Sequence, residues 1–534
     1  MGSVYEQSDG VGDIPPPAPS APVPAGWVVN DSDDPRVVAQ QETEDYTNHV
    51  VPLTARQPRI AVLGSWWSIA SAMAFLYYGA LAASLAGTRQ ALIGLLVVVV
   101  VCSVLGAFIA RASIGRGLNS TLLTRAMFGV KGAALTPLIC GLGALYYAVF
   151  ESSVMAAALQ AYFQVFDIRV WYAIVIIGML PLMLGGMQTW FTKLNTWSLP
   201  IYLIGVAAAV LVAGIRFGWG GDWFTTTPEI TGHSSIPGWL VTFVLFMGNW
   251  LLFPDTPEFA RFGRPSDTRF HANITFGWAF YLVAYGFNGL AGILIVALAA
   301  PGSTVAESAV TTGIVTSLGV IGLVVVLVSQ VRINSANFYV ASLCFDRVVC
   351  HFSRSSLPRK VWVVLIAIVT FLLMLTNVFS YIATALAWQG IVTVSWVGIV
   401  VTHLLVVSRR PEIRALRLPT VTRGFAVWAV SAAIGLVALE SGHSVASQVA
   451  PLISLGASVV LYLLNVLLLD RLFTTTRVTD DPGTVRDDDR DQWLTRTQCS
   501  SCELSYTTYE VDAAADHPAE PLCLQCQMRP LAHQ

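Results

Sequence analysis

The chain has 534 residues, of which 55% are hydrophobic and 12% are charged, and its mean hydropathy is +0.65. Soluble domains carry about 25% charged residues, so this composition excludes an ordinary soluble protein and predicts a polytopic membrane protein. The net charge of −2 indicates no affinity for nucleic acid. The opening residues predict no cleavable signal peptide.

The polarity of the chain divides it into five predicted parts. Residues 1–59 are polar, Pro-rich and acidic, and they predict a disordered cytosolic tail. Residues 60–472 hold the apolar runs and predict the transmembrane domain. Residues 473–498 form an acidic linker, residues 499–526 form a small module with four cysteines, and residues 527–534 form a short tail.

Twelve apolar runs are each long enough to cross a bilayer as a helix, which takes about 20 residues. They lie near residues 60–86, 90–110, 134–163, 170–190, 195–215, 237–257, 271–300, 314–343, 361–380, 382–407, 424–440 and 448–470. The fold class that we expect is therefore an all-α membrane protein with 12 transmembrane helices. An even number of spans places both ends of the chain on the same side.

The basic residues in the connectors predict which side this is. Only Arg89, Arg169 and Arg216 fall in loops on the far side, whereas the other basic residues near the span ends fall on the side of the N-terminus. Cytoplasmic loops of membrane proteins carry an excess of Lys and Arg. We therefore expect a protein of the cytoplasmic membrane with both termini in the cytosol.

Two ionisable residues stand well inside predicted spans, Glu151 in the third and Arg332 in the eighth. Such residues are costly in lipid and mark functional sites by default. The alternative is that the two pair as a helix-packing device, although buried ion pairs often add little net stability. Gln330, Asn334 and Asn337 form one polar stripe on the eighth span, which favours a cavity wall.

The sixth and first predicted spans carry signals for an interrupted helix. The sixth reads GNWLLFPDTPEFARFG, where Pro254 and Pro257 cannot continue the backbone hydrogen-bond ladder. The first contains a fainter counterpart, GSWWSIASAMAF, which includes Ser68 and Ser71. Discontinuous helices near the bilayer midplane form the substrate sites of many secondary transporters. The pattern therefore predicts a transporter.

Three stretches of the sequence resemble the nucleobase:cation symporter-1 family, which includes cytosine, purine, uracil, thiamine and allantoin permeases. They are LLTRAMFGVKGAAL (122–135), FPDTPEFARFG (253–263) and WWSIASAMAFLYYGALAASLAG (66–87). The resemblance covers roughly residues 42–470. It implies the leucine-transporter-type fold, with a 5+5 inverted repeat plus two helices. In that fold the site lies between broken helices one and six and helices three and eight.

The resemblance also implies substrate-binding residues. The family's aromatic residue and Gln on helix three fall on Tyr147 and Glu151, and its helix-six Trp falls on Trp250, preceded by Asn249. Tyr147 and Trp250 would sandwich a flat heterocycle by offset stacking; the alternative is that both rings only pack between helices. A carboxylate in place of Gln accepts two N–H donors, so the expected ligand presents adjacent N–H groups or is cationic.

The eighth span departs from the family pattern. The positions that hold sodium in sodium-coupled members fall on Ser329, Arg332 and Ile333. Ile333 has no oxygen for a hard cation, and the Arg332 guanidinium would occupy or repel the site. We therefore expect no sodium site and proton coupling through Glu151 and Arg332. The candidate substrate-binding residues are Tyr147, Glu151, Asn249, Trp250, Asn334, Asn337, Ser68 and Ser71.

Four cysteines near the C-terminus form two close pairs. Cys499 and Cys502, then Cys523 and Cys526, give the spacing C-x2-C-x20-C-x2-C, which is typical of a structural Zn²⁺ site with four thiolate ligands. Disulfides and a redox-sensing role are the alternatives, and a reducing cytosol disfavours the first. So short a module would fold on the metal and serve regulation or dock a cytosolic protein partner.

The sequence as a whole predicts a secondary active transporter that imports a nucleobase or related nitrogenous heterocycle, driven by protons and independent of sodium. Its expected partners are this small molecule and the lipid bilayer. No residue pattern suggests covalent chemistry, and no Gly-rich phosphate loop occurs, so neither an enzyme nor an ATP-driven pump is expected. Two other classes stay open. One is an uncoupled facilitator or exchanger with a permanent Glu151–Arg332 pair, and the other is a transporter-derived ligand sensor that signals through the zinc tail.

Overall fold

The structure is a computed structural model that describes most of the chain. The described residues are 23–24, 29–30, 34–43, 46, 49–129, 131–184, 187–224, 235–299, 309–353, 358–376, 382–407, 421–469, 484–485, 496–507, 510–513, 520–523 and 526. Most of them are helical, and the strands are short and lie near the two ends of the sequence.

The helices account for the membrane domain. They are α1 (Pro35–Thr43), α2 (Arg59–Trp66), α3 (Ala74–Ala86), α4 (Thr88–Arg116), α5 (Ser120–Phe128), α6 (Leu135–Phe163), α7 (Ile168–Leu184), α8 (Met187–Phe217), α9 (Gly238–Met247), α10 (Leu252–Ala260), α11 (Thr268–Phe270), α12 (Trp278–Tyr281), α13 (Asn288–Ala299), α14 (Ala309–Leu318), α15 (Val320–Ser353), α16 (Arg359–Met374), α17 (Ile382–Thr402), α18 (Arg423–Glu440), α19 (Ser444–Gln448) and α20 (Ala450–Leu464). Short 3-10 or π segments adjoin them: η1 (Leu53–Ala55), η2 (Ile69–Ser71), η3 (Gly132–Ala134), η4 (Gly221–Phe224), η5 (Pro265–Asp267), η6 (His271–Thr275), η7 (Leu282–Phe287), η9 (His403–Val407) and η10 (Asn465–Leu469).

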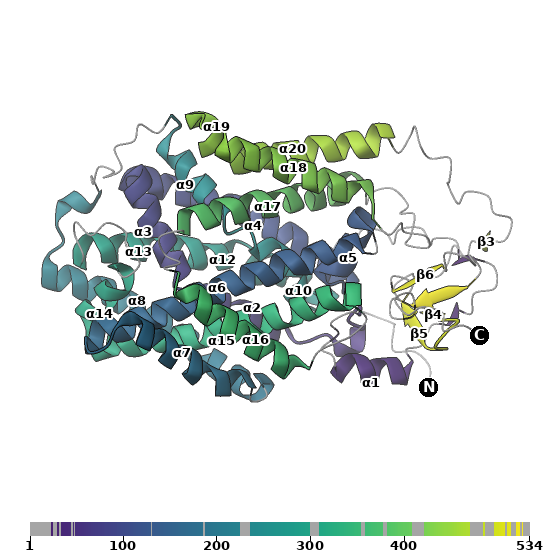
Figure 1. The fold of residues 1–534 in the computed structure, drawn as a ribbon, viewed down its shortest axis with the longest axis horizontal. Coiled ribbons are helices and arrows are strands. Elements are labelled where there is room, and N and C mark those ends of the chain that lie inside the picture. The colour runs from purple at the N-terminus through teal and green to yellow at the C-terminus, as the bar shows by residue number, and fades with distance from the viewer. Residues whose placement is uncertain are drawn as a thin grey trace.

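The strands form three small antiparallel sheets beside one end of the helical bundle (Figure 1). They are β1 (Val23–Pro24), β2 (Val29–Asn30), β3 (Thr484–Val485), β4 (Arg496–Gln498), β5 (Ser505–Thr507), β6 (Val511–Ala513) and β7 (Pro521–Cys523). β1 pairs with β3 and β2 pairs with β4, so residues near the start of the chain pair with residues near its end. Figure 1 shows β4, β5 and β6 at the same end of the bundle as α1 and α5.

The helices pack around a central pair. α6 and α15 lie against each other, and α7 and α16 cover one side of α6. On another side α17, α18 and α20 pack together and form the uppermost layer in Figure 1. Small residues allow the closest approach elsewhere: a Cβ at Gly79 of α3 would lie 2.2 Å from the carbonyl oxygen of Gly289 in α13. Such small-residue contacts are common between membrane helices.

Each of the twelve predicted runs overlaps helical residues of the structure, so the all-α prediction is confirmed. Among the described residues, eight helices are long and apolar enough to cross a membrane, or ten if each bent pair counts as one span. α7 and α16 are shorter, with 17 and 16 residues. The number of twelve spans therefore stays a prediction.

Two predicted boundaries differ from the structure. The eighth span was expected to begin at residue 314, but α14 ends at Leu318 and α15 begins at Val320. Gly319 separates them with φ +61°, a conformation that ends a helix and favours glycine. The fourth span was expected to reach residue 190, whereas α7 ends at Leu184. The predicted division near residue 380 lies outside the described residues.

Helices one and six are both interrupted, as predicted. Residues 59–71 and 74–86 meet at a bend of 44°, and residues 238–247 and 252–260 meet at 49°. The second break lies upstream of Pro254, because a proline is tolerated in the first turn of a helix, where its missing N–H has no partner to lose. At this break a Cβ on Gly248 would lie 2.7 Å from the Leu386 carbonyl oxygen, so glycine permits the close contact with α17.

The described residues 34–43, 46 and 49–59 of the predicted disordered tail include buried side chains, which differs from the disorder expected there. Val37 and Val51 are buried there. Arg56 donates hydrogen bonds to the carbonyl oxygens of Val51, Ile114 and Gly263 at 2.8–2.9 Å. Burial lowers the pKa of Arg56 to about 10, which still leaves the guanidinium charged at neutral pH. The polar, Pro-rich composition did not predict this packing, because it depends on contacts of single side chains that form no periodic pattern in the sequence.

Candidate functional site

A cavity of about 50 Å³ lies where the two interrupted helices meet α6 and α15. Its lining residues come from all four elements: Ile69, Ala72, Ala74, Phe75, Ala144, Tyr147, Glu151, Asn249, Leu251, Leu252, Asp255, Phe259, Ile333, Ala336, Asn337 and Val340. Most of the lining is apolar, and a few polar groups converge on it, which is the usual composition of a small-molecule site. Four of the eight predicted substrate-binding residues line it, namely Tyr147, Glu151, Asn249 and Asn337.

Glu151 is a residue of α6, and its side chain reaches the start of α3, the second half of helix one. The backbone N–H of Ala74, the first residue of α3, donates to Oε1 of Glu151 at 3.4 Å. The first N–H groups of a helix have no partner within it and favour a negative charge nearby. The side chain is fully buried, and Oε2 has no hydrogen-bond partner among the described residues. One oxygen thus faces the helix terminus, and the buried Gln330 side chain also interacts with this carboxyl group.

A hydrogen-bond network holds Asn249 at the second break. The Tyr147 hydroxyl donates to the Asn249 side-chain oxygen at 2.5 Å, and the Asn249 amide donates to the Tyr285 hydroxyl at 3.0 Å. Gln389 of α17 donates to the carbonyl oxygen of Gly248 at 2.9 Å, which satisfies a backbone group that the break leaves outside the helical ladder. These contacts fix the orientation of two predicted site residues, Tyr147 and Asn249.

One face of α15 contacts the break in helix one. The Ser329 hydroxyl donates to the Ser71 carbonyl oxygen at 2.6 Å, and Ile333 lines the cavity one turn further on. Arg332 lies between them at helical spacing and is 1% exposed. Asn337 lines the cavity one turn beyond Ile333. This face therefore carries the three residues that the resemblance assigned to the sodium positions.

The structure does not bring the other predicted residues to the described cavity lining. Trp250 packs edge-on against Phe243 and Phe253, with ring centroids 6.3 and 5.3 Å apart. Its side chain is 2% exposed and is not among the described lining residues, so the sandwich with Tyr147 stays a prediction. The reason is local: residues 248–251 are not helical, so helical spacing does not carry across them.

Asn334, Ser68 and Ser71 are engaged in contacts within and between helices. The Asn334 amide donates to the Ser152 hydroxyl of α6 at 2.6 Å. The Ser68 and Ser71 hydroxyls donate to backbone carbonyls three residues earlier, at 2.6 and 3.0 Å. In this structure Asn334 joins two helices, and the two serine hydroxyls satisfy carbonyl oxygens near the break.

Three cavity residues, Phe75, Asp255 and Phe259, were not singled out from the sequence. Phe75 and Phe259 gave no distinguishing signal among many aromatic residues. Asp255 did give one, because it lies two residues inside the predicted end of the sixth span, where a carboxylate is costly. Its place beside two prolines made it look like part of the polar end of that span.

A second cavity, of about 170 Å³, adjoins the first, and Phe259 and Val340 line both. Its polar lining includes an ion-pair network in which Arg347 donates to both carboxylate oxygens of Glu258 at 2.9 and 3.1 Å. The Ser120 hydroxyl also donates to Glu258, at 2.5 Å, and Arg261 lies 3.6 Å from it. The network ties α5, α10 and α15 together at the end of the bundle where the strands lie.

We expect Arg347→Met to lower the free energy of unfolding by about 3 kcal/mol, because the longer Arg261 contact is then the only ion pair left to the buried Glu258 carboxylate among the described residues, beside its hydrogen bonds from Ser120. The double variant Glu258→Gln/Arg347→Met should lose less, since it removes the charge together with its partner. Thermal denaturation of the purified protein in detergent checks both. A double variant that is less stable than Arg347→Met would contradict this reading of the network.

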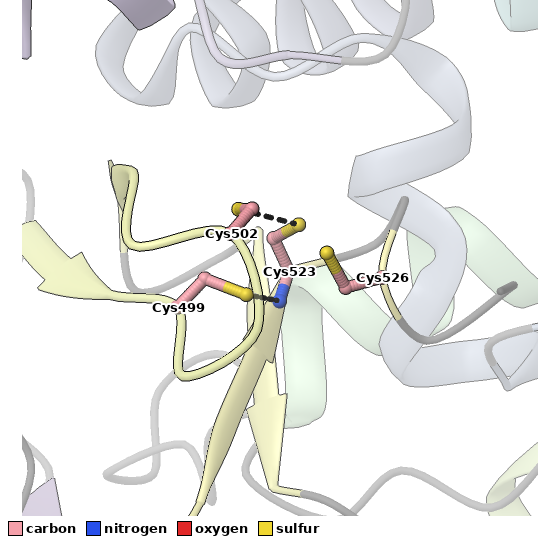
Figure 2. A group of neighbouring side chains, drawn as sticks. All are labelled: Cys499, Cys502, Cys523 and Cys526. Atoms are coloured by element: carbon pink, nitrogen blue, oxygen red, sulfur yellow. Dashed lines mark hydrogen bonds between the residues drawn. The ribbon is translucent and has the colours of Figure 1, made fainter. Parts of the chain in front are cut away.

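The four predicted metal ligands lie together. The Sγ atoms of Cys499, Cys502, Cys523 and Cys526 are all within 4.8 Å of one another. Figure 2 shows the four side chains grouped together. Cys502 Sγ lies 3.9 Å from Cys523 Sγ. A tetrahedral ion with Zn–S bonds of about 2.3 Å places its sulfurs about 3.8 Å apart, whereas a disulfide needs about 2.05 Å. The four cysteines are free, and their arrangement fits a metal better than a disulfide.

The electrostatics of the cysteine cluster also suit a cation. Hydrogen bonds from the Cys523 thiol and from backbone N–H groups lower the pKa of Cys499, which favours the thiolate form of this sulfur. One such bond joins the Cys523 N–H to Cys499 Sγ at 3.3 Å. A thiolate is the form of cysteine that binds a metal. The residues present therefore fit a metal site with four cysteine ligands.

The cysteine module, residues 499–526, contacts the segment that precedes helix one. Glu510 accepts a hydrogen bond from the Val50 N–H, and its other carboxylate oxygen lies 3.6 Å from His49 Nδ1. The His49 and Tyr506 rings stack with centroids 5.9 Å apart. Tyr46, just upstream, accepts a hydrogen bond from Arg261 at the end of helix six. The module is thereby linked through this segment to the end of the interrupted sixth helix.

No protein-family model and no curated protein matches this sequence. Solved structures do match. The inward-facing structure of Mhp1 superposes with a TM-score of 0.64 at 17% identity, covering 82% of this chain and 96% of that one. A second Mhp1 structure, described as a nucleobase-cation-symport-1 family transporter in a closed conformation with bromovinylhydantoin bound, superposes with a TM-score of 0.61 at 16% identity. The match covers 81% of this chain and 97% of that one. A Na⁺-coupled sialic acid symporter in a substrate-bound outward-open state superposes with a TM-score of 0.57 at 14% identity, and the match covers 78% of this chain and 91% of that one.

These likenesses show the fold of the chain. The chain has the fold of these membrane transporters, which are not enzymes, and it is a multi-pass membrane protein. More particularly, the two Mhp1 structures share with it nearly their whole length, so its fold is the one seen in Mhp1. The fold expected from the sequence motifs is thus confirmed.

Proposed function

We propose that the protein is a secondary transporter of the nucleobase-cation-symport-1 family that imports a nitrogenous heterocycle across the cytoplasmic membrane. The observation that carries this proposal is the cavity at the two helix breaks, where Tyr147, Glu151, Asn249 and Asn337 converge. A flat ring can pack on the apolar lining while the amides and the carboxylate bind its polar edge. The cavity must widen to admit a whole ring, and the bent helices are the elements that can move.

Glu151 is proposed to serve both recognition and coupling. It accepts from the α3 N-terminus and keeps one oxygen for a donor, so a ring N–H or a proton can bind there. Either event weakens the attraction between the carboxylate and the helix terminus, since the terminus favours a full negative charge. Binding at Glu151 is thereby linked to the position of α3, one half of an interrupted helix.

We propose proton coupling without sodium. Ser329 and Ile333 flank Arg332 on the α15 face that contacts the break in helix one, where the Ser71 carbonyl oxygen already accepts from Ser329. An isoleucine side chain offers no oxygen to a hard cation, and a guanidinium brings its own positive charge. The Arg332 guanidinium would supply, as a fixed charge, the positive charge that a bound sodium ion would otherwise bring to this region. The ion that is transported is then a proton.

The test is uptake of radiolabelled cytosine, adenine, hypoxanthine, uracil and allantoin into cells expressing the full chain or an empty vector. Sodium is replaced by choline, and the external pH is stepped. The proposal expects uptake of at least one of these compounds that does not need sodium and rises at acid pH. Absence of uptake for the whole panel would refute the heterocycle assignment, and a strict need for sodium would refute the coupling assignment.

We further propose that the cysteine module holds one structural Zn²⁺ and docks on its own chain in the cytosol. Cys499, Cys502, Cys523 and Cys526 would be the ligands. The module's described partner is the segment around His49 and Val50, which Glu510 contacts. This contact also favours, as a second candidate, a protein in which the ligand site signals through the module. Binding without uptake would support that candidate.

We expect Glu510→Ala to release this contact. The Val50 N–H loses a charge-assisted hydrogen bond, worth about 1.5–3 kcal/mol, so its hydrogen exchange should accelerate by roughly tenfold or more. Exchange monitored by mass spectrometry on the purified protein checks this. The exposed Glu520→Ala is the matched control and should leave the exchange unchanged. Equal protection in the two variants would show that Glu510 does not hold the segment.

A further inference from the structure

Asp255 is a second carboxylate in the central cavity. It lies in the first turn of α10, the second half of helix six, and its side chain is part of the cavity lining. Its Oδ1 is buried and has no hydrogen-bond partner among the described residues. The nearby Glu258 differs, because Arg347 and Ser120 satisfy its oxygens outside this cavity. The Cys140 thiol hydrogen-bonds to this carboxyl group. Oδ1 is therefore the Asp255 atom that remains available to a ligand.

A carboxylate lies near the start of the second half of each interrupted helix. Glu151 of α6 accepts a hydrogen bond from the first residue of α3, and Asp255 lies within the first turn of α10 itself. A helix N-terminus carries about half a positive charge, which offsets only part of one carboxylate. The Ala74 N–H already engages one oxygen of Glu151, whereas Asp255 Oδ1 has no such donor in the part of the chain that the structure describes.

The charge of the cavity follows from its lining. Glu151 and Asp255 are its only ionisable carboxylates, and none of its described lining residues is Lys, Arg or His. A cavity lined by one sign of charge with apolar walls attracts the opposite sign and repels the same sign. With a neutral ligand, a buried carboxyl group must either take up a proton or stay charged without a counter-charge among the lining residues. A cationic ligand supplies that counter-charge and so favours the ionised form.

We propose that this cavity binds a cationic nitrogen heterocycle, with Asp255 as the ion partner of its charge and Glu151 as the acceptor for its N–H edge. The inference rests on the proposed transport function and narrows its substrate class. Asp255 is then a specificity-determining residue that selects positive over neutral and negative rings. Anionic heterocycles are excluded by repulsion from both carboxylates.

The test uses three matched six-membered rings: 4-aminopyridinium (positive), pyridine-4-carboxamide (neutral) and pyridine-4-carboxylate (negative). Their binding to the purified full chain is measured by thermal stabilisation across a millimolar concentration series. We expect the cation to bind at least tenfold more tightly than the neutral ring and the anion not to bind. Asp255→Asn should abolish this preference and Asp255→Glu should keep most of it.

Two further arms make the outcomes distinguishable. Asp346→Asn changes a carboxyl that accepts from Trp362 outside the cavity, and it should leave the preference intact. Equal binding of the three rings, no binding of the cation, or an unchanged preference in Asp255→Asn would each overturn the proposal. If neutral bases are taken up by wild type and Asp255→Asn alike, the transport function stands and the cation assignment fails. If nothing is taken up but the preference persists, only the transport function fails.

Discussion

Glu151→Gln is expected to reduce heterocycle uptake at least tenfold and to make the remaining uptake insensitive to pH. The amide oxygen can still accept from the Ala74 N–H, so the start of α3 keeps its hydrogen bond. The amide cannot bind or release a proton, and it loses the negative charge that the helix terminus favours. Initial rates of uptake between acid and neutral pH check this.

The effect should be specific to the cavity. Glu440→Gln makes the same chemical change at an exposed position at the end of α18 and should behave as wild type. If Glu151→Gln instead transports at the normal rate with the normal pH dependence, Glu151 is a structural cap of α3 and another group couples transport. Asp255 would then be the first carboxylate to examine.

The second large effect is expected from the loss of zinc. The purified full chain should contain about one zinc ion per polypeptide, and Cys499→Ser/Cys502→Ser should contain none, since two thiolates leave a structural site incomplete. Structural zinc sites in small modules contribute an apparent 10–16 kcal/mol at neutral pH, so the module should unfold without the ion. Elemental analysis by mass spectrometry measures the metal, and limited proteolysis reports the folding of residues 499–526.

The membrane domain should survive this change. Cys102→Ala alters a buried cysteine of α4 and is the control that should keep the zinc content. A wild-type chain that binds no zinc at micromolar free metal would contradict the assignment, and so would loss of zinc in the control. Loss of metal together with unfolding of the whole protein would show that the module and the bundle form one cooperative unit.

Much of the fold could be predicted because hydropathy and helix breakers act locally. Apolar runs gave the helices, and the Gly, Ser and Pro content of residues 64–75 and 248–263 marked the two interruptions. The position of the second break was less predictable. Pro254 lies within the first turn of α10, and the turn at residues 248–251 depends on the close contact of Gly248 with α17.

The candidate site was predictable only in part. Tyr147 and Glu151 share one unbroken helix, so the four-residue spacing placed both at the cavity. Trp250 follows a break, where the direction of a side chain depends on backbone turns that spacing does not describe, and it packs against Phe253 instead. Asp255 was missed because a carboxylate near the predicted end of a span resembles an ordinary interfacial charge.

The contact between the cysteine module and the segment before helix one had no signal in the sequence. Val50 and Glu510 are separated by 460 positions, and their contact depends on single side chains with no repeat. The four cysteines were predictable because their spacing alone defines the ligand set. The metal-ligand set was therefore predictable from local spacing, whereas the position of the cysteine module relative to the helical bundle required the structure.

The most direct test of the account is transport by the purified protein in sodium-free proteoliposomes. Radiolabelled heterocycles from the uptake panel and 4-aminopyridinium are supplied outside, with the external side held acidic relative to the lumen. We expect accumulation above equilibrium that collapses when a protonophore dissipates the pH gradient. Accumulation that requires a sodium gradient and ignores the pH gradient would contradict the central claim.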